Sequence, residues 1–306
     1  MLSSLILSTF FIIPADLQVP EDWYTSTTRL FEFCVEAQFE HPMCPQISQV
    51  PGIERKHPDI AIPEPSGDLT TENLFNANLL YQLKRPPYSW LVKLNLSEKM
   101  AKESDERLWA EAQYLYARVL FDQRKYKEAD TVFDRIVDTF KGKALFHQQR
   151  GWSQFFSGKL DRALGSIVSA ESPLIYSIPY FEKYFLRALV ERESCQWSKA
   201  FDTVSKGREF LKTAKADASA QPWVVLCDRK NLGETCQKLR AFYDGYYKDE
   251  IRKALNDLDL VELEMRDRGV TKPQKKSDSP IVWPFVGEAW SDELGFYSVP
   301  VRAQCG

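Results

Sequence analysis

The chain has 306 residues, of which 44% are hydrophobic and 27% are charged, and its formal net charge is −3. This ordinary globular composition excludes an intrinsically disordered chain and leaves room for one substantial core or two modest domains. Lysine and arginine are mixed with acids along the chain, so no basic stripe is available to neutralise a run of phosphates. Nucleic acid is therefore not an expected partner.

The first element is an apolar run, MLSSLILSTFFIIPA, which is too short to cross a bilayer as a helix. Residues 1–15 are expected to be a signal peptide cleaved after Ala15, although no Lys or Arg precedes the run; a buried first strand or helix is the alternative. No cysteine sits just after the run for acylation. Export predicts a periplasmic or secreted protein with no transmembrane span after cleavage.

Residues 16–103 read as a flanking region of helical and extended segments. Apolar residues at helical spacing predict a helix over 21–39, and the proline-rich stretch 45–66 predicts an extended strap. A second helix is expected over 69–84, with Thr71 as its cap and Pro86-Pro87 as its stop. The segment 89–96 is ambiguous.

Three segments, 112–136, 146–170 and 183–207, repeat one pattern. A small residue is followed nine residues later by an apolar one and three residues after that by alanine, at Ala117, Tyr126 and Ala129, then Gly151, Leu160 and Ala163, then Ala188, Trp197 and Ala200. The steps of 34 and 37 residues are typical of a helix-turn-helix repeat. Small residues at these points let the two helices of a pair cross closely. Residues 104–214 are thus predicted to form an all-α solenoid of three hairpins.

These positions, together with Phe133 and Gly158, resemble tetratricopeptide repeats. The resemblance implies a right-handed superhelix that binds a peptide or protein and acts as a scaffold or adaptor. The stretch LGSIVSAESPLIY and the tail WPFVGEAWSDELGFY also look like exported repeat proteins of bacterial envelopes.

The region after the repeats is expected to cap the solenoid. Residues 215–270 predict further helices, chiefly one over 231–268 that Gly245 could break in two. One face of it is expected to pack across the open end of the superhelix through Leu239, Phe242, Tyr246, Leu255, Leu258 and Met265. Residues 271–306 form a linker and an aromatic tail.

The predicted binding surface is the concave groove lined by the first helix of each repeat. Counting from the small residue, the expected groove residues are Glu111, Tyr114, Arg118, Phe121, Leu145, Gln148, Trp152, Phe155, Glu182, Phe185, Leu189 and Arg192. Aromatic residues and arginines carry much of the energy of protein interfaces, which favours an extended peptide or a helix as ligand. The alternative is that the chain's own amino-terminal segment or tail covers these residues, which leaves the convex side or the inserted loop for binding.

The tail allows two interpretations. Its aromatic side chains are either an exposed platform for glycan or cell-wall binding or part of a packed cap; they are Trp283, Phe285, Trp290, Phe296 and Tyr297, with Glu288, Asp292 and Glu293 as polar neighbours. The cap is favoured, because large exposed aromatic clusters are uncommon on soluble monomers.

Six cysteines in an exported chain fit disulfides better than thiols. Two local bridges are natural from the spacing, and a third would join the tail to the third repeat; the pairs are Cys34–Cys44, Cys227–Cys236 and Cys195–Cys305, one of 15 connectivities. In a cytosolic chain all six would instead be buried thiols. No CxxC pair occurs, so a metal site is not expected.

Catalytic motifs are missing from the sequence, which contains no P-loop, GxGxxG, GxSxG or HExxH pattern. No cofactor is therefore expected. A carboxylate-based hydrolase using Glu288, Asp292 or Glu293 is the enzymatic alternative. The sequence predicts a non-enzymatic interaction protein, and the ends of a solenoid permit self-association.

Overall fold

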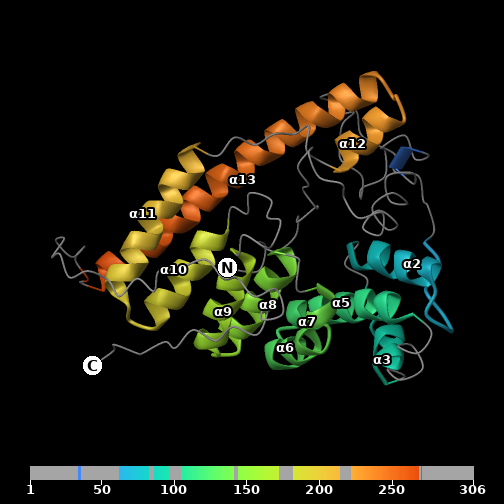
Figure 1. The fold of residues 1–306 in the computed structure, drawn as a ribbon, viewed down its shortest axis with the longest axis horizontal. Coiled ribbons are helices and arrows are strands. Elements are labelled where there is room, and N and C mark those ends of the chain that lie inside the picture. Colours follow the sequence, from blue (N-terminus) through green and yellow to red (C-terminus); the bar gives the residue numbers. More distant parts are fainter. Residues whose placement is uncertain are drawn as a thin grey trace. The chain divides into compact units, whose positions relative to one another are not determined.

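The computed structural model describes residues 34–35, 62–82, 86–96, 105–140, 144–171, 182–213, 222–268 and 270 (Figure 1). Every regular element among these residues is an α-helix, which confirms the all-α prediction. The chain divides into two compact units, one formed by Met1–Glu64, Phe75–Arg85 and Lys215–Asp249, the other by Pro65–Leu74, Pro86–Ala214 and Glu250–Gly306.

Two helices contribute residues to both units, α2 (Thr71–Gln82) and α13 (Glu234–Asp267). The unit that contains the repeats also holds α3 (Tyr88–Leu96), α5 (Glu106–Asp122), α6 (Tyr126–Arg135), α7 (Val137–Phe140), α8 (Ala144–Phe156), α9 (Leu160–Ala170), α10 (Lys183–Glu193) and α11 (Trp197–Thr213). Helices α5 and α6, α8 and α9, and α10 and α11 pack as pairs, and each pair packs on the next. This succession of neighbouring hairpins is the predicted helical solenoid.

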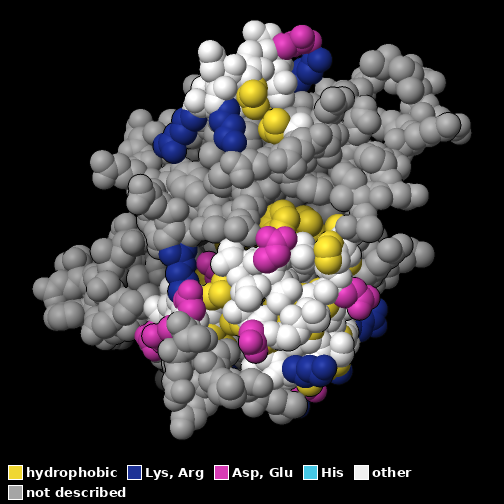
Figure 2. Space-filling model, turned by 90° about the vertical axis from the view of Figure 1, so that its right-hand side faces the viewer, with side chains coloured by type: hydrophobic (Ala, Val, Ile, Leu, Met, Phe, Trp, Pro, Cys, Tyr) yellow, Lys and Arg dark blue, Asp and Glu magenta, His cyan; other side chains and the backbone are white. Residues whose placement is uncertain are grey.

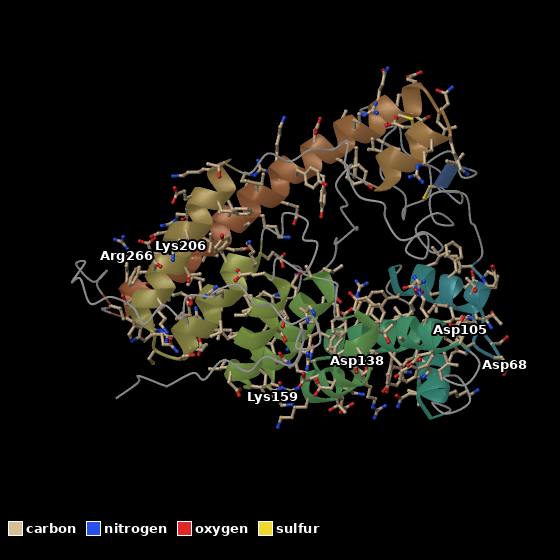
Figure 3. The ribbon with its side chains drawn as sticks, viewed as in Figure 1. Asp68, Asp105, Asp138, Lys159, Lys206 and Arg266 are labelled. Carbon is tan, nitrogen blue, oxygen red and sulfur yellow. A yellow bond between two sulfur atoms is a disulfide. The ribbon has the colours of Figure 1, made fainter. Side chains whose placement is uncertain are left out.

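The starts of two helices are fixed by side-chain caps. Asp105 (Figure 3) accepts hydrogen bonds from the amides of Arg107 and Leu108 at 3.1 and 2.9 Å, which satisfies two free amides at the start of α5. At the start of α2 the capping hydroxyl belongs to Thr70, which accepts from the Asn73 amide at 3.1 Å, and not to the expected Thr71. The ambiguous segment 89–96 lies in α3.

The turn within each predicted repeat has one geometry. Arg124, Gly158 and Cys195 adopt left-handed φ values of 62°, 79° and 54°. The amide of each donates to the carbonyl three residues earlier, and the next amide donates to the carbonyl five residues earlier, at distances of 2.8 to 3.0 Å. This is the Schellman motif, which ends one helix and positions the next. Helices α6 and α9, which follow the first two of these turns, begin without a side-chain cap.

The same turn occurs a fourth time, 36 residues after Cys195. Asn231 has φ 54°, its amide donates to Asp228 O at 3.0 Å, and the Leu232 amide donates to Cys227 O at 3.3 Å. Helix α12 (Pro222–Arg229) and the start of α13 are therefore a fourth helix-turn-helix hairpin, which the sequence pattern did not reveal.

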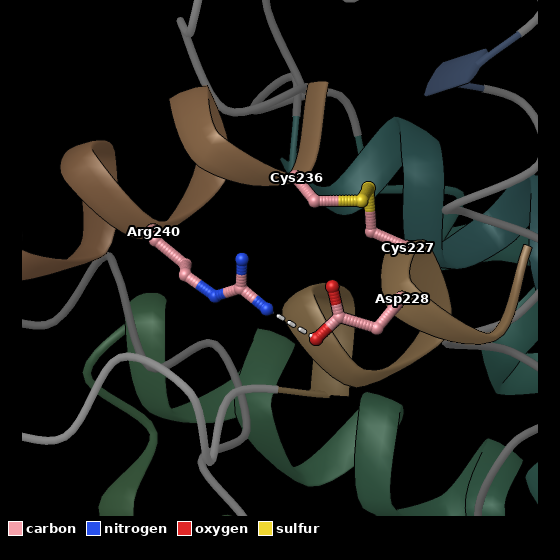
Figure 4. The surroundings of a disulfide bond; sticks show 4 residues. All are labelled: Cys227, Asp228, Cys236 and Arg240. Atoms are coloured by element: carbon pink, nitrogen blue, oxygen red, sulfur yellow. Dashed lines mark hydrogen bonds and ion pairs between the residues drawn. A yellow bond between two sulfur atoms is a disulfide. The ribbon is translucent and has the colours of Figure 1, made fainter. Parts of the chain in front are cut away.

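This fourth hairpin carries a covalent link between its helices (Figure 4). Cys227 and Cys236 form the predicted disulfide, with their Cα atoms 5.5 Å apart. In register with the other hairpins, Cys236 occupies the position of Ala129, Ala163 and Ala200. Cys34 is disulfide-bonded, and so is Cys195. The partners predicted for them, Cys44 and Cys305 respectively, lie outside the described residues.

The small residues of the repeat lie at helix crossings, as predicted. Ala117, Ala129, Ala163, Ala188 and Ala200 are fully buried. A Cβ on Gly151 would lie 3.5 Å from Ser166 Cβ on α9, the predicted partner helix, and 3.2 Å from Leu186 Cδ2 on α10, so α8 approaches both helices closely there. The sequence pattern thus identified the contacts that bring the helices of the solenoid together.

Polar contacts recur in the same register. Within the second and third hairpins, Gln154 accepts a hydrogen bond from Ser166 at 2.7 Å, and Glu191 accepts one from Thr203 at 2.6 Å. Burial is the largest influence on Glu191 and raises the pKa of its carboxyl. The first hairpin has the buried apolar pair Leu120 and Val132 at these positions.

Successive hairpins are joined by ion pairs that use an arginine at the same register. Arg150 on α8 binds Asp134 on α6 at 2.6 Å, and Arg187 on α10 binds Glu171, which follows α9, at 2.9 Å. The two arginines occupy the same register, eight residues before the turn residues Gly158 and Cys195, whereas the acids lie at different positions, within α6 and at the end of α9.

The carboxyl-terminal half of α13 packs on the last predicted repeat. Arg208 on α11 binds Asp259 at 2.5 Å and also binds Glu262, while Arg192 on α10 binds Glu264. The expected capping role is thereby confirmed for residues 250–267.

The path and the buried face of α13 differ in part from the prediction. The helix continues through Gly245 without a break. Phe242, Tyr246 and Leu255 are only partly buried, whereas the buried stripe consists of Cys236, Leu239, Tyr243, Tyr247, Ala254, Leu258, Val261 and Met265. These positions lie three, four or seven apart, which keeps them on one face.

Several predictions concern residues outside the described ranges. They include the signal peptide at 1–15, most of the first helix and the strap, and the tail at 271–306. Among the described residues, no helix combines the length and the apolar character needed to cross a membrane.

Candidate binding site: an aromatic row on the repeat helices

Four side chains from three hairpins form a continuous row of rings, which we call the aromatic row: Tyr126, Phe156, Trp152 and Phe185. Successive ring centroids are 4.8, 5.7 and 5.8 Å apart. The Tyr126 and Phe156 rings, and the Phe156 and Trp152 rings, are stacked with interplanar angles of 22° and 21°. Stacked aromatic pairs in this distance range attract one another beyond the effect of burial alone.

Local geometry explains how the row is positioned. Trp152 and Phe156 are four residues apart on α8, so they lie on one face of that helix. Tyr126 is the first residue of α6, placed by the turn at Arg124, and Phe185 comes from α10. Phe121 closes the Tyr126 end with edge-on contacts to Tyr126 and Phe156 at 5.2 and 5.9 Å.

The aromatic row is supported by the core and is accessible at its centre. Trp152 and Phe155 pack against a buried cluster that includes Ile167, Leu186 and Val190. Phe156 is 39% exposed, and the other three rings of the row are partly exposed. Among the described residues, only Leu260 and Leu263 on α13 join Phe156 as exposed large hydrophobic side chains. An accessible aromatic surface held by a packed core is typical of an interaction site.

Three of the predicted groove residues, Trp152, Phe155 and Phe185, are brought together here. Trp152 contacts Phe155 edge-on at 6.0 Å and Phe185 at 5.8 Å. Sequence counting missed Phe156, which follows Phe155 and is 39% exposed, and it used Tyr126 only as a position of the repeat pattern. The four-residue spacing of Trp152 and Phe156 was the signal that could have found the row.

Three other predicted groove residues are buried and do not line an open groove. Phe121, Gln148 and Leu189 are 9%, 4% and 8% exposed. Phe121 is enclosed by neighbouring rings, and Gln148 donates a hydrogen bond to Glu182 at 3.4 Å. The reason is that each hairpin packs closely on the next, which sequence counting within one hairpin does not register.

Tyr114 and Arg192 are also engaged by contacts within the protein. The ring of Tyr114 lies against Phe133, Phe140 and Phe146, and burial raises the pKa of its hydroxyl to about 12. Arg192 is bound by Glu193 at 2.7 Å and by Glu264 of α13. Arg192, one of the two arginines expected in the groove, is therefore engaged by α13.

The remaining predicted positions are partly exposed. They are Glu111, which pairs with Arg107 at 3.5 Å, and Arg118, Leu145 and Glu182. Of these, Glu182 lies next to the aromatic row, because it is the N-cap residue of α10, three residues before Phe185, and is bonded to Gln148 on α8.

The two ends of the aromatic row carry different charges. Glu182 and Gln148 lie one helical turn beyond Phe185 and Trp152. At the other end, the exposed residues Arg124 and Lys125 directly precede Tyr126, and they outnumber the exposed Asp122. Lys125 also donates to the hydroxyl of Tyr88 at 3.2 Å.

A separate charge cluster joins the first two hairpins. Asp134 binds Arg150 and Arg162, and the fully buried Asp130 accepts a hydrogen bond from Lys159 (Figure 3) at 2.6 Å. Every charged side chain named in the cluster has a partner of opposite charge within it, so the cluster is suited to fixing the joint between α6, α8 and α9.

Other classes of site were also sought. Within the described ranges, no group of three or more His, Cys, Asp or Glu side chains is placed to hold a metal ion. On the face drawn in Figure 2, acidic and basic side chains of the described residues are interspersed and form no continuous basic patch. The tail aromatics and carboxylates of the glycan and hydrolase alternatives lie outside the described residues.

The chain matches no protein-family model, no curated protein and no solved structure. Its class is therefore defined by its own geometry, an all-α protein of stacked helical hairpins.

Proposed function

We propose that this protein is a non-enzymatic scaffold or adaptor that binds a peptide or protein partner through the aromatic row. The observation that carries this proposal is the stacked and accessible row Tyr126, Phe156, Trp152 and Phe185, which crosses three hairpins. Aromatic side chains dominate the binding energy of protein interfaces, particularly where packed neighbours support them.

Preorganisation supports the same proposal. The rings are held by helices and by one another, so a partner that docks on them loses less conformational entropy than it would on a mobile loop. A glycan is a poorer fit at this row, because sugars stack on free ring faces and Phe156 has Tyr126 and Trp152 stacked against it.

We further propose a divergent tetratricopeptide-like protein of a bacterial periplasm or cell envelope. The register of the four turns, with steps of 34, 37 and 36 residues, supports the family resemblance. The disulfides support an oxidising compartment, in which such bonds form and persist.

The proposal is tested by affinity capture from an envelope extract, followed by a direct binding measurement with the purified partner. Trp152→Ala and Phe156→Asp are the test variants, and Phe156→Asp introduces the residue type that Asp122 provides at the same register of the first hairpin. Lys206→Ala is the control, since the side chain of Lys206 (Figure 3) on α11 is 65% exposed and pairs with Asp202 in the same helix.

We expect both row variants to weaken binding by roughly tenfold or more while their unfolding midpoints show that they are folded. The Lys206→Ala variant should bind like the wild type. A partner that binds all of these variants equally would exclude the aromatic row as the binding site.

A further inference from the structure

We propose that the segment recognised by the aromatic row is an amphipathic α-helix, bound with its amino-terminal end toward Glu182. This inference rests on the proposed function, because it names the kind of partner that the same row would bind. It follows from the spacing of the rings and from the charges at the two ends of the row.

The direction of the aromatic row is set by α8. Gln148, Trp152 and Phe156 follow one another at four-residue intervals on this helix. Each contacts a side chain from another element: Gln148 is bonded to Glu182, the Trp152 ring contacts Phe185, and the Phe156 ring stacks on Tyr126. The row and its polar extension therefore run along α8 for two turns and beyond.

The spacing of the rings corresponds to the repeat of a helix. The centroid steps of 4.8, 5.7 and 5.8 Å bracket the helical pitch of about 5.4 Å. Side chains on one face of a strand recur every ~6.7 Å, and a polyproline turn advances by about 9.3 Å. Of these three conformations, the helix has the repeat closest to the centroid steps of the row.

Charge complementarity fixes the orientation. A bound helix has a partial positive charge at its amino terminus and a partial negative charge at its carboxyl terminus. Glu182 at one end of the row and Arg124 with Lys125 at the other match this polarity.

The required ligand can be described from these features. It has apolar side chains at positions i, i+4, i+7 and i+11 along about three turns of helix. Basic residues in its first turn would face Glu182, and acidic residues in its last turn would face Arg124 and Lys125.

A selection experiment tests the inference without a known partner. A phage library of random 16-residue peptides is selected on the immobilised full chain and counter-selected on the Phe156→Asp variant. The enriched peptides are then synthesised with a fluorescent label, and their dissociation constants are measured by anisotropy against the wild type, Trp152→Ala and the Lys206→Ala control.

We expect enriched peptides with a 3.6-residue apolar period and basic residues near their amino ends. Peptides with a two-residue apolar period or proline-rich peptides would overturn the helix while leaving the aromatic row as a peptide site. Failure to enrich any peptide whose affinity falls in Phe156→Asp and Trp152→Ala would overturn the proposed function as well.

Orientation is tested with Glu182→Lys. We expect this variant to bind the enriched peptides about fivefold more weakly, and to regain affinity for peptides in which the basic residues of the first turn are replaced by glutamate. An unchanged preference in Glu182→Lys would contradict the assigned direction of the bound helix.

Discussion

The substitution Gly207→Ala adds one methyl group where the last repeat packs against α13, and it therefore tests that packing. A Cβ at this position would lie 2.7 Å from Tyr184 Cβ on α10 and 2.8 Å from Leu258 Cδ1 on α13. The leucine can rotate, but Tyr184 Cβ is attached directly to the backbone. Helices α10 and α11 would therefore have to move apart in Gly207→Ala.

The expected magnitude combines two opposing effects. Overpacking a core position of this kind costs about 1–3 kcal/mol, and alanine recovers roughly 0.5–1 kcal/mol relative to glycine inside a helix. We therefore expect Gly207→Ala to lower the free energy of unfolding by about 1–2 kcal/mol.

Gly245→Ala is the matched control, since Gly245 also lies inside a helix but a Cβ there meets no atom of the described residues within 4 Å. It should gain about 0.5–1 kcal/mol from helix propensity alone. Urea unfolding followed by circular dichroism gives the free energies, and amide hydrogen exchange reports α10 and α11 separately from the other compact unit. Equal stabilisation by both substitutions would refute the packing of α10, α11 and α13 described here.

Two further predictions concern stability. Replacing Cys227 and Cys236 together by alanine should destabilise α12 and the start of α13 by about 2.5 kcal/mol, because the disulfide closes a loop with a sequence separation of nine. Hydrogen exchange at the Leu232 amide measures this loss, and unchanged protection would contradict it. Burial raises the pKa of Glu191 above its unfolded value, so the stability associated with this carboxyl is present at low pH and is lost as pH rises through the folded pKa. Glu191→Gln introduces the residue found at Gln154 in the preceding hairpin. The free energy of unfolding of this variant, minus that of the wild type, should therefore increase as pH rises from 4 to 7. Urea unfolding across that range measures the difference, and a constant or falling difference would argue against the prediction.

Sequence alone determined the helical class and the position of three hairpins. Ala117, Gly151 and Ala188 mark helix crossings because close approach requires a small side chain, and this requirement is visible in the local pattern. The Cys227–Cys236 disulfide was also predictable, since a short loop limits the partners that a cysteine can reach.

The candidate site was predicted only in part. Trp152, Phe155 and Phe185 were found by counting from the small residues, whereas Phe156 was not. Counting gives the face of a helix, but the exposure of a side chain depends on what the neighbouring hairpins cover.

Only the tertiary structure decided the long-range arrangement. Arg192 is engaged by Glu264, 72 residues later, and the buried stripe of α13 includes Tyr243 and Tyr247 in place of the expected Phe242 and Tyr246. The fourth hairpin was hidden because its turn is recognised by backbone hydrogen bonds that several residue types can make. Local patterns specify helices and turns, while the partner of each helical face is set by contacts between residues far apart in the chain.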